Sequence, residues 1–375
     1  MGRLRLAIYL LLSTLTLVPD NQVSAALPSD ELWRESLINN IVGFARNTSG
    51  GAGGSLCRVT NLNNSGPGSL RACAEHTDRQ WIIFDVSGTI SLSSVILVKS
   101  NKTIDGRGAN ITIVNQGLIV GRWGSGSATD NVIVHNIKFD NITSNCNICI
   151  GEDASNVWID HVTFDSPRVD ETIYVGSGDG SYTGAGPKSI TVSWNRFIGH
   201  WPPSGLPGDS GASFLISDQG NTEDIDTTVT IHHNHFDTMQ SRQPMVHWAK
   251  VHAFNNYHNK PYTCVEGRSN AQYYSENDIF EAESQNGDGV LVKTWEGGPF
   301  PAAANVKVVS PWLINGATVQ QINASTIFNP SSYYSYTAET ADEALRAKIV
   351  SNAGWQNVTS PTANSLQAPT NLVVK

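Results

Sequence analysis

The residues best suited to chemistry lie in one stretch, SRQPMVHWAKVHAFNNYHN, which runs from residue 241 to residue 259. It contains Arg242, two residues before a proline, and then His247 and Trp248. A guanidinium group is positively charged and binds carboxylates, and only its rare neutral form removes a proton. Three interpretations of Arg242 therefore stand at the outset: a catalytic group, a binder of an acidic substrate, or one charge at the edge of a strand.

Two other groups have the residue types of a site. Asp160 and His161 have the types of a catalytic pair, but they close the strand-like stretch VWIDH, and we expect them to be structural residues at a bend. His232, His233 and His235 suggest a metal cluster. Alternation along a strand sends His233 to the face opposite His232, and no acidic ligand is close in sequence, so the pattern disfavours zinc.

A repeat dominates the middle of the chain. Alternating apolar residues are followed by Asn, His or Trp in each unit, and the five units are VIVHNIKF (132–139), VWIDHVTF (157–164), ITVSWNRF (190–197), VTIHHNHF (229–236) and VHAFNNYH (251–258). The closing Phe of the first four units recurs at spacings of 25, 33 and 39 residues. Repeats of this length predict a solenoid, in which loops of different length are inserted on one side.

We therefore expect an all-β fold, a right-handed parallel β-helix with short capping helices. Inward Val, Ile and Phe would stack from coil to coil, and Asn at the bends would hydrogen-bond along the stack. Residues 81–92 and 101–113 have the pattern of earlier coils. A β-sandwich is the competing fold, but it predicts regular hairpin turns, which fit the long insertions less well.

Helical patterns occur at the two ends of the repeat region, over residues 31–45, 70–76 and 339–354. Residues 1–25 have basic residues, a short apolar run and small residues at the end, which is the layout of a secretory signal peptide. No other apolar run is long enough to span a membrane. We expect a secreted protein with a single domain over residues 26–375.

The bulk composition limits the classes of binding partner that the protein could have. The net charge is −9, which disfavours nonspecific binding to nucleic acid. With a signal peptide, the Asn-x-Ser/Thr sequons indicate a glycoprotein, although abundant Asn and Ser also produce sequons by chance. The seven sequons begin at Asn47, Asn63, Asn101, Asn110, Asn141, Asn323 and Asn357. We expect a monomer.

The chain has five cysteines, so at least one has no partner within the chain. Secretion favours disulfides, and Cys57 with Cys73 is the preferred pair. Cys146 and Cys149 form a C-x-x-C sequence, but it lies in a strand-like run, which disfavours a redox function. The spacing also disfavours a four-cysteine zinc site.

Taken together, these motifs resemble polysaccharide lyase family 1, the pectate lyase superfamily. The resemblance covers most of residues 40–355. The motifs that carry it are GFARNTSGGAGG (43–54), GPGSLR (66–71), WIIFDVSGTI (81–90), SNKTIDGRGA (100–109), VWIDH (157–161), ITVSWNRFIGH (190–200), RQPMVHWAKVHAFNNY (242–257) and AGW (353–355). The resemblance implies a parallel β-helix that cleaves polygalacturonate by β-elimination, often with Ca²⁺ bridging enzyme and substrate.

The resemblance also assigns roles to residues. By its Arg-x-Pro spacing, Arg242 matches the catalytic arginine that removes the C5 proton of a uronate. Substrate binding is assigned to three residues, which are His200, His247 and Trp248. Calcium binding is assigned to Asp170 and Asn147, and the ion would neutralise the substrate carboxylate. The expected partner is a pectic polysaccharide.

Four positions depart from the family pattern. A second arginine is replaced by His247, and Asn147 and Tyr174 stand where acidic calcium ligands are usual. Pro203 stands where many pectate lyases have a substrate-binding lysine. Because fewer charged ligands weaken calcium binding, the departures favour weak Ca²⁺ affinity. Two carboxylates that could substitute are Glu171 and Asp153.

Three alternatives stay open on the sequence. The first is a calcium-independent pectin lyase acting on methyl-esterified pectin. The second is a β-helical polygalacturonase, which would need acid and base carboxylates around the scissile bond. The third is a noncatalytic carbohydrate-binding β-helix, which the four departures suggest and the retained Arg242 and Pro244 oppose.

Overall fold

The structure is a computed structural model, and it describes residues 29–123, 127–143, 146–165, 171–178, 184–199, 213–218, 220–261, 263–282, 290–294 and 303–358. The expected signal peptide, residues 1–25, lies outside these residues and stays a prediction. Among the helices that are described, none has the length and apolar character needed to cross a membrane.

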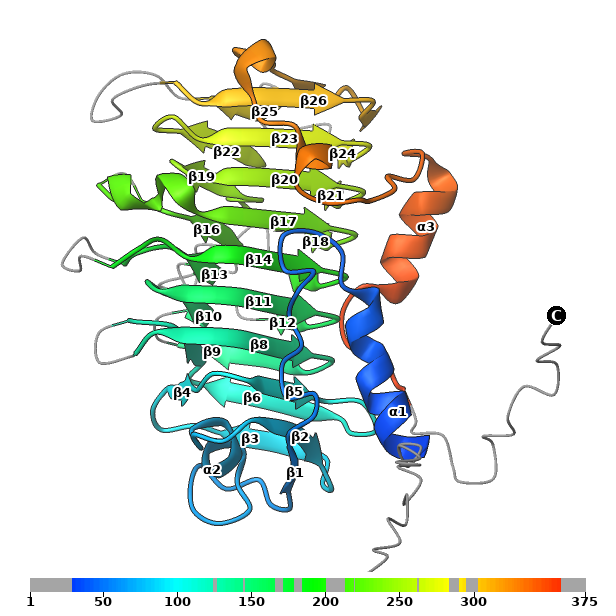
Figure 1. The fold of residues 1–375 in the computed structure, drawn as a ribbon. Helices are drawn as coiled ribbons and strands as arrows, with labels where there is room; N and C mark the ends of the chain where they lie inside the picture. Colours follow the sequence, from blue (N-terminus) through cyan, green and yellow to red (C-terminus); the bar gives the residue numbers. More distant parts are fainter. Residues whose placement is uncertain are drawn as a thin grey trace, which may run out of the picture.

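Three parallel sheets form the body of the molecule, and successive coils stack along one axis (Figure 1). Sheet A consists of β1 Ser55–Val59, β2 Gln80–Phe84, β5 Lys102–Asp105, β8 Thr129–His135, β11 Ala154–Asp160, β14 Lys188–Ser193, β17 Thr228–His232, β20 Lys250–Phe254, β23 Gln272–Glu276 and β26 Asn305–Val309. Sheet B consists of β3 Gly88–Ser91, β6 Ile111–Asn115, β9 Lys138–Ile142, β12 Thr163–Asp165, β15 Arg196–Ile198, β18 His235–Asp237, β21 Tyr257–Asn259, β24 Ile279–Glu281 and β27 Trp312–Ile314. Sheet C consists of β4 Ile96–Val98, β7 Leu118–Val120, β10 Cys146–Ile150, β13 Glu171–Val175, β16 Phe214–Ile216, β19 Met245–His247, β22 Val265–Arg268, β25 Val290–Thr294 and β28 Thr318–Val319.

This arrangement confirms the predicted parallel β-helix. Each coil runs through one strand of sheet C, one of sheet A and one of sheet B, so every repeat unit seen in the sequence spans the corner between sheets A and B. The segments at 81–92 and 101–113 also form coils, through β2 with β3 and β5 with β6. No hairpin pairing is present between the named strands, as all of their pairings are parallel, which excludes the β-sandwich for this part of the chain.

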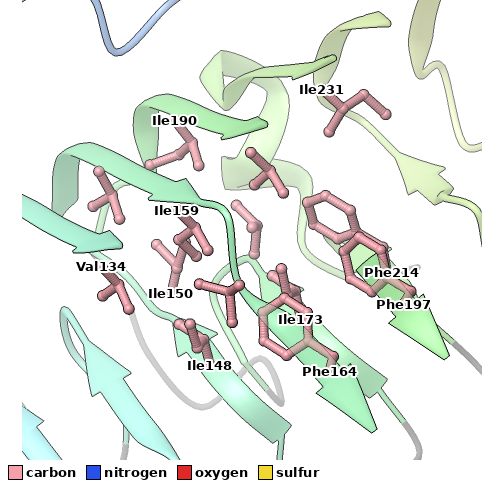
Figure 2. Packing of buried hydrophobic residues seen from close by; sticks show 14 of the residues in the cluster. Val134, Ile148, Ile150, Ile159, Phe164, Ile173, Ile190, Phe197, Phe214 and Ile231 are labelled. Atoms are coloured by element: carbon pink, nitrogen blue, oxygen red, sulfur yellow. The ribbon is translucent and has the colours of Figure 1, made fainter. Parts of the chain in front are cut away.

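Inward side chains fill the interior by stacking on their equivalents in neighbouring coils (Figure 2). The clearest stack lies behind sheet B, where the ring centroids of Phe139, Phe164, Phe197 and Phe236 follow one another at 5.6, 5.0 and 4.7 Å. His258 continues the stack 4.8 Å from Phe236, which explains why the fifth repeat unit ends in His without breaking the pattern. Burial lowers the pKa of His258 to about 3, so the ring is neutral there.

Asparagines at the corner between sheets A and B form a ladder along the axis, as the sequence predicted. The side-chain oxygen of Asn234 accepts from the backbone N–H and the amide of Asn195, and Asn256 does the same for Asn234. The last rung is Asp278, whose Oδ1 accepts from the backbone N–H of Asn256 at 2.7 Å and from its amide at 3.0 Å. An acid therefore ends a ladder of neutral amides.

Helices are short and lie at the ends or the side of the solenoid. The α-helices are α1 Ser29–Glu35, α2 Leu70–Ala74 and α3 Glu343–Asn352, and the 3₁₀ turns are η1 Ser36–Asn40, η2 Thr222–Asp226, η3 Ala324–Thr326 and η4 Pro330–Ser332. The helix predicted over 31–45 ends early, at Asn40. Beyond it, hydroxyls on sheet A satisfy the backbone: Phe44 N–H donates to Thr230 at 3.1 Å, and Ala45 N–H donates to Thr191 at 3.1 Å.

The cysteine prediction is confirmed, and one pair was missed. Cys57 and Cys73 form the expected disulfide, which ties β1 to α2. Cys146 and Cys149 form a second disulfide within β10, so the C-x-x-C sequence is a local cross-link on sheet C. Cys264 is a free and buried thiol.

Candidate active site

Arg242 lies three residues before β19, in the turn that leads into this strand of sheet C. Its backbone is left-handed, with φ of 55°, and its carbonyl oxygen accepts from the backbone N–H of Phe214 at 2.7 Å. The hydroxyl of Ser213 donates to the same oxygen at 2.5 Å. These bonds to the preceding coil fix the backbone from which the guanidinium projects.

The turn that carries Arg242 is anchored in the core. The next residue, Gln243, is fully buried, and its amide donates to the carbonyl oxygen of Met239 at 2.9 Å. Its side-chain oxygen lies 3.1 Å from Nδ1 of His258, the ring that continues the phenylalanine stack. The stack and the arginine turn are therefore directly connected.

The guanidinium of Arg242 forms an ion pair with the carboxylate of Glu171, at the start of β13. The Arg242 side chain is 25% exposed and that of Glu171 is 14% exposed. The arginine thus remains accessible from one side while a carboxylate holds it from another. A substrate carboxylate would have to compete with Glu171 for this group.

A second arginine, Arg268, lies on the next coil of sheet C. His247 in β19 and Arg268 in β22 are direct partners in the parallel register. His247 is only 2% exposed, and its Nδ1 lies 3.1 Å from the hydroxyl of Ser269. Burial lowers the pKa of His247 to about 4, with the charges of Arg268 and Arg242 acting in the same direction. His247 is therefore neutral at neutral pH, whereas Arg268 supplies a positive charge on the same face.

Arg268 was missed by the sequence reasoning. Its Nη2 lies 2.6 Å from a carboxylate oxygen of Glu266, and its side chain is 19% exposed. The signal that could have found it is the coil length, because the asparagine ladder advances 22 residues from Asn234 to Asn256 and again to Asp278. Counting about one such coil from His247 leads to Arg268.

The remaining predicted substrate contacts are placed only in part. Trp248 is 8% exposed, also has a left-handed backbone, and donates its backbone N–H to Ser269 at 3.0 Å. His200 and Pro203 lie outside the described residues. The roles assigned to His247, Trp248 and His200 stay predictions.

Two of the positions expected to bind calcium, Asn147 and Tyr174, lie on neighbouring strands of sheet C. Asn147 lies on β10 between the disulfide-bonded Cys146 and Cys149, is fully buried and offers only a neutral oxygen. Tyr174 carries a phenol whose pKa is raised by burial, packed edge-on against Trp123 at 4.8 Å. Calcium needs six to eight oxygen ligands, several of them charged. At the expected positions, the described residues do not fit such a cage, and Asp170 lies outside them.

The two carboxylates suggested as substitutes are engaged elsewhere. Glu171 pairs with Arg242, as described. Asp153 lies 3.0 Å from the guanidinium of Arg122, and it accepts a hydrogen bond from the backbone N–H of Ala185 at 3.1 Å. The two ion pairs, with Arg242 and with Arg122, neutralise negative charge that a bound cation would need.

The row of side chains along the face of sheet C is largely apolar. The register aligns Ile119, Cys149, Tyr174, Leu215 and Met245 across five successive strands. These residues form a buried cluster of their own, separate from the interior of the solenoid. This apolar row therefore lies beside Arg242, His247 and Arg268.

Comparison with known proteins gives matches over most of the chain. A family model described as pectate lyase matches residues 40–358. Pectate lyase 1 of Cryptomeria japonica is 29% identical over 297 residues, covering 71% of this chain and 73% of its own. A pectate trisaccharide-lyase of Bacillus licheniformis is 27% identical over 329 residues, covering 84% and 86%.

Solved structures show the same fold. The cedar pollen allergen Jun a 1 superimposes with a TM-score of 0.72 at 25% identity, covering 88% of this chain and 97% of the allergen. A pectate lyase of Bacillus sp. N165, solved in complex with trigalacturonate, gives a TM-score of 0.60 at 23% identity and covers 85% and 99%.

Proposed function

Because this chain belongs to the pectate lyase family and is a polysaccharide lyase, we propose that it cleaves the α-1,4-linked galacturonate backbone of polygalacturonate by β-elimination. The observation that carries the proposal is Arg242, whose carbonyl oxygen is held by hydrogen bonds from the preceding coil of sheet C while its side chain stays partly exposed. Secretion, through the predicted signal peptide, belongs to the same proposal.

The reaction sets three tasks. A base removes the proton at C5 of a uronate, the negative charge that develops beside the carboxylate is stabilised, and the oxygen at C4 leaves. We assign the first task to Arg242. For the base to act, the guanidinium must leave the carboxylate of Glu171 and give one proton to solvent, and the neutral side chain then takes the C5 proton of the bound uronate.

For the second task, we assign to Arg268 the binding of the uronate carboxylate beside which the charge develops. Arg268 lies opposite His247 on the next coil, its charge and that of Arg242 both lower the pKa of His247, and it already binds one carboxylate, that of Glu266. A planar guanidinium binds carboxylates through two parallel hydrogen bonds, which a neutral imidazole cannot reproduce. Arg268 thus takes over the role expected of an arginine at position 247.

Replacing Arg268 should mainly weaken substrate binding. Loss of a charge-assisted hydrogen bond corresponds to a rise in KM of about 10- to 100-fold for Arg268→Ala. Steady-state kinetics on polygalacturonate measure this, and Arg268→Lys should recover part of the loss. An Arg58→Ala variant, in an exposed ion pair with Asp85, is the matched control. Unchanged KM in Arg268→Ala would remove this residue from the site.

The calcium assignment to Asn147 and Asp170 stays a prediction, and its consequence is weak binding. With a neutral amide and a phenol at two of the expected positions, we expect elimination on polygalacturonate to need roughly millimolar free Ca²⁺. Activity is followed by the ultraviolet absorbance of the unsaturated product, with and without EDTA. Full activity in EDTA would contradict the assignment, and the absence of any absorbing product on either substrate form would contradict the lyase proposal.

A second candidate substrate is methyl-esterified pectin, and one observation favours it. The ester is neutral, so it does not require the cation that the described donors fit poorly, and Tyr174 and Met245 present an apolar row beside the arginines. The same absorbance assay on esterified pectin separates the two substrates.

A further inference from the structure

Three metal-ligating side chains converge far from sheet C, at the corner between sheets A and B. His135 ends β8, Asp160 ends β11 directly opposite it in the register, and His161 follows. Their ligand atoms all lie within 4.8 Å of one another. Oδ2 of Asp160 lies 3.0 Å from Nδ1 of His135 and 2.5 Å from Nδ1 of His161. One carboxylate oxygen of Asp160 therefore contacts both imidazoles.

The surroundings hold these three groups in place. The other oxygen of Asp160 accepts from the hydroxyl of Ser193 at 2.5 Å, and that hydroxyl accepts from the indole N–H of Trp158 at 2.8 Å. The His161 ring stacks on Trp194, with centroids 5.9 Å apart and planes 15° apart. Orientation of ligands by a second layer of hydrogen bonds and stacking is typical of metal sites.

The cluster of His135, Asp160 and His161 also borders a cavity. His135, Asp160 and His161 all line a cavity of about 530 Å³, with Trp194 and Lys348 among its other walls. His135 and Asp160 are buried, whereas the His161 side chain is 25% exposed. An ion bound to the three groups would have an entry path and room for the water that completes its coordination.

We propose that His135, Asp160 and His161 form a binding site for a divalent transition-metal ion of the zinc class. Two imidazoles and one carboxylate suit zinc, whereas calcium and magnesium prefer oxygen ligands alone. Zinc–ligand bonds of about 2.0–2.1 Å place tetrahedral ligands roughly 3.3 Å apart, so the present nitrogen–oxygen distances must widen slightly. His161, whose side chain is 25% exposed, can make that adjustment while it remains stacked on Trp194.

The proton balance is simple. Each imidazole faces Asp160 through its Nδ1, and a hydrogen bond to the carboxylate requires a proton on that nitrogen. On metal binding, the coordinating nitrogen gives up this proton and the other ring nitrogen carries one, so a neutral imidazole holds the ion. The site is independent of the proposed lyase reaction, because Arg242 and Arg268 lie on sheet C and the cluster does not.

The test uses the full-length protein, stripped of metal with a chelator and then dialysed. Calorimetric titration with Zn²⁺ should show one ion bound per chain with a Kd of micromolar or below, and Co²⁺ should give visible absorption bands. His161→Asn removes a ligand but suits the backbone, since φ of His161 is 52° and Asn adopts this left-handed region readily. We expect at least a 100-fold loss of Zn²⁺ affinity.

A matched control exists two coils further on. His233 has φ of 56° and, like His161, stacks on the ring of Trp194, with centroids 4.3 Å apart. His233→Asn should leave Zn²⁺ affinity within about twofold, and urea unfolding checks that both variants are folded. Absence of Zn²⁺ binding by the unmodified protein, or affinity lost in His233→Asn and kept in His161→Asn, would overturn the proposal.

Discussion

Arg242→Asn should reduce the rate of elimination by about 10³-fold or more, because it removes the proposed base, and general bases contribute about 10²- to 10⁴-fold. Asn is preferred to Ala here because Arg242 has φ of 55°, and Asn tolerates this conformation with little strain. Arg242→Lys keeps the charge but not the planar geometry, so we expect a loss of about 10²-fold. The measurement is kcat on polygalacturonate from the initial rise in ultraviolet absorbance.

The control is a cation in the same backbone conformation, away from sheet C. Lys260 follows β21, is exposed and has φ of 51°. Lys260→Asn should keep kcat within about twofold, which separates the loss of a base from the loss of a charge at a left-handed position. Near-normal rates in both Arg242 variants would leave Arg242 as a structural partner of Glu171 only.

The Glu171 ion pair gives an independent way to distinguish these roles. If Arg242 served only to neutralise Glu171, then Glu171→Gln would remove the need for Arg242. The rate of elimination would then be insensitive to Glu171→Gln and to Arg242→Asn. In the proposed reaction the two residues behave differently, because Arg242 acts on the substrate and Glu171 competes with it. The contrast rests on the side-chain exposure of Arg242, 25%, which gives a substrate room to approach.

The fold was readable in the sequence because its determinants are periodic. The phenylalanines at 139, 164, 197 and 236 mark equivalent positions of successive coils, and their rings do stack. The asparagine ladder was predicted for the same reason, since each rung repeats the chemistry of the one before. Variable loop lengths did not obscure these signals, because insertions leave the strand positions unchanged.

The site was readable only where a local motif carried it. Arg-x-Pro located Arg242, but its partner Glu171 is 71 residues away and is brought to it by coil stacking. His135 is likewise 25 residues before Asp160. The sequence therefore suggested only the pair of Asp160 and His161 and missed the third member of the cluster. Helix boundaries failed for a different reason, because hydroxyls of Thr191 and Thr230 on sheet A take up the backbone N–H groups beyond Asn40.

The end of the asparagine ladder has a large consequence for stability. Asp278 is fully buried, and burial raises its pKa from 3.8 to about 7, against the opposing effect of hydrogen bonds from Ser275 and Asn256. The folded state therefore holds the Asp278 proton more tightly than the unfolded state does. Stability from this group is fully present below about pH 4 and is lost as pH rises towards 7.

Asp278→Asn should therefore stabilise the protein in a pH-dependent way. Between pKa values of 3.8 and about 7, the difference corresponds to a gain on the order of 4 kcal/mol in the free energy of unfolding at pH 8, and to little change near pH 4. The amide is isosteric, its oxygen can accept from Asn256, and its nitrogen can donate to the hydroxyl of Ser275. The ladder would then continue as neutral amides throughout.

Urea unfolding of both proteins at pH 5 and pH 8 measures the effect. Asp85→Asn is the control, since the Asp85 side chain is 38% exposed and its ion pair with Arg58 is at the surface, where such pairs contribute about 0–1 kcal/mol. The stabilisation by Asp278→Asn should grow with pH, because only the ionised carboxylate is costly in this position. A constant difference at both pH values would mean that folding does not raise the pKa of Asp278, and a loss of stability at pH 8 would mean that its charge supports the ladder.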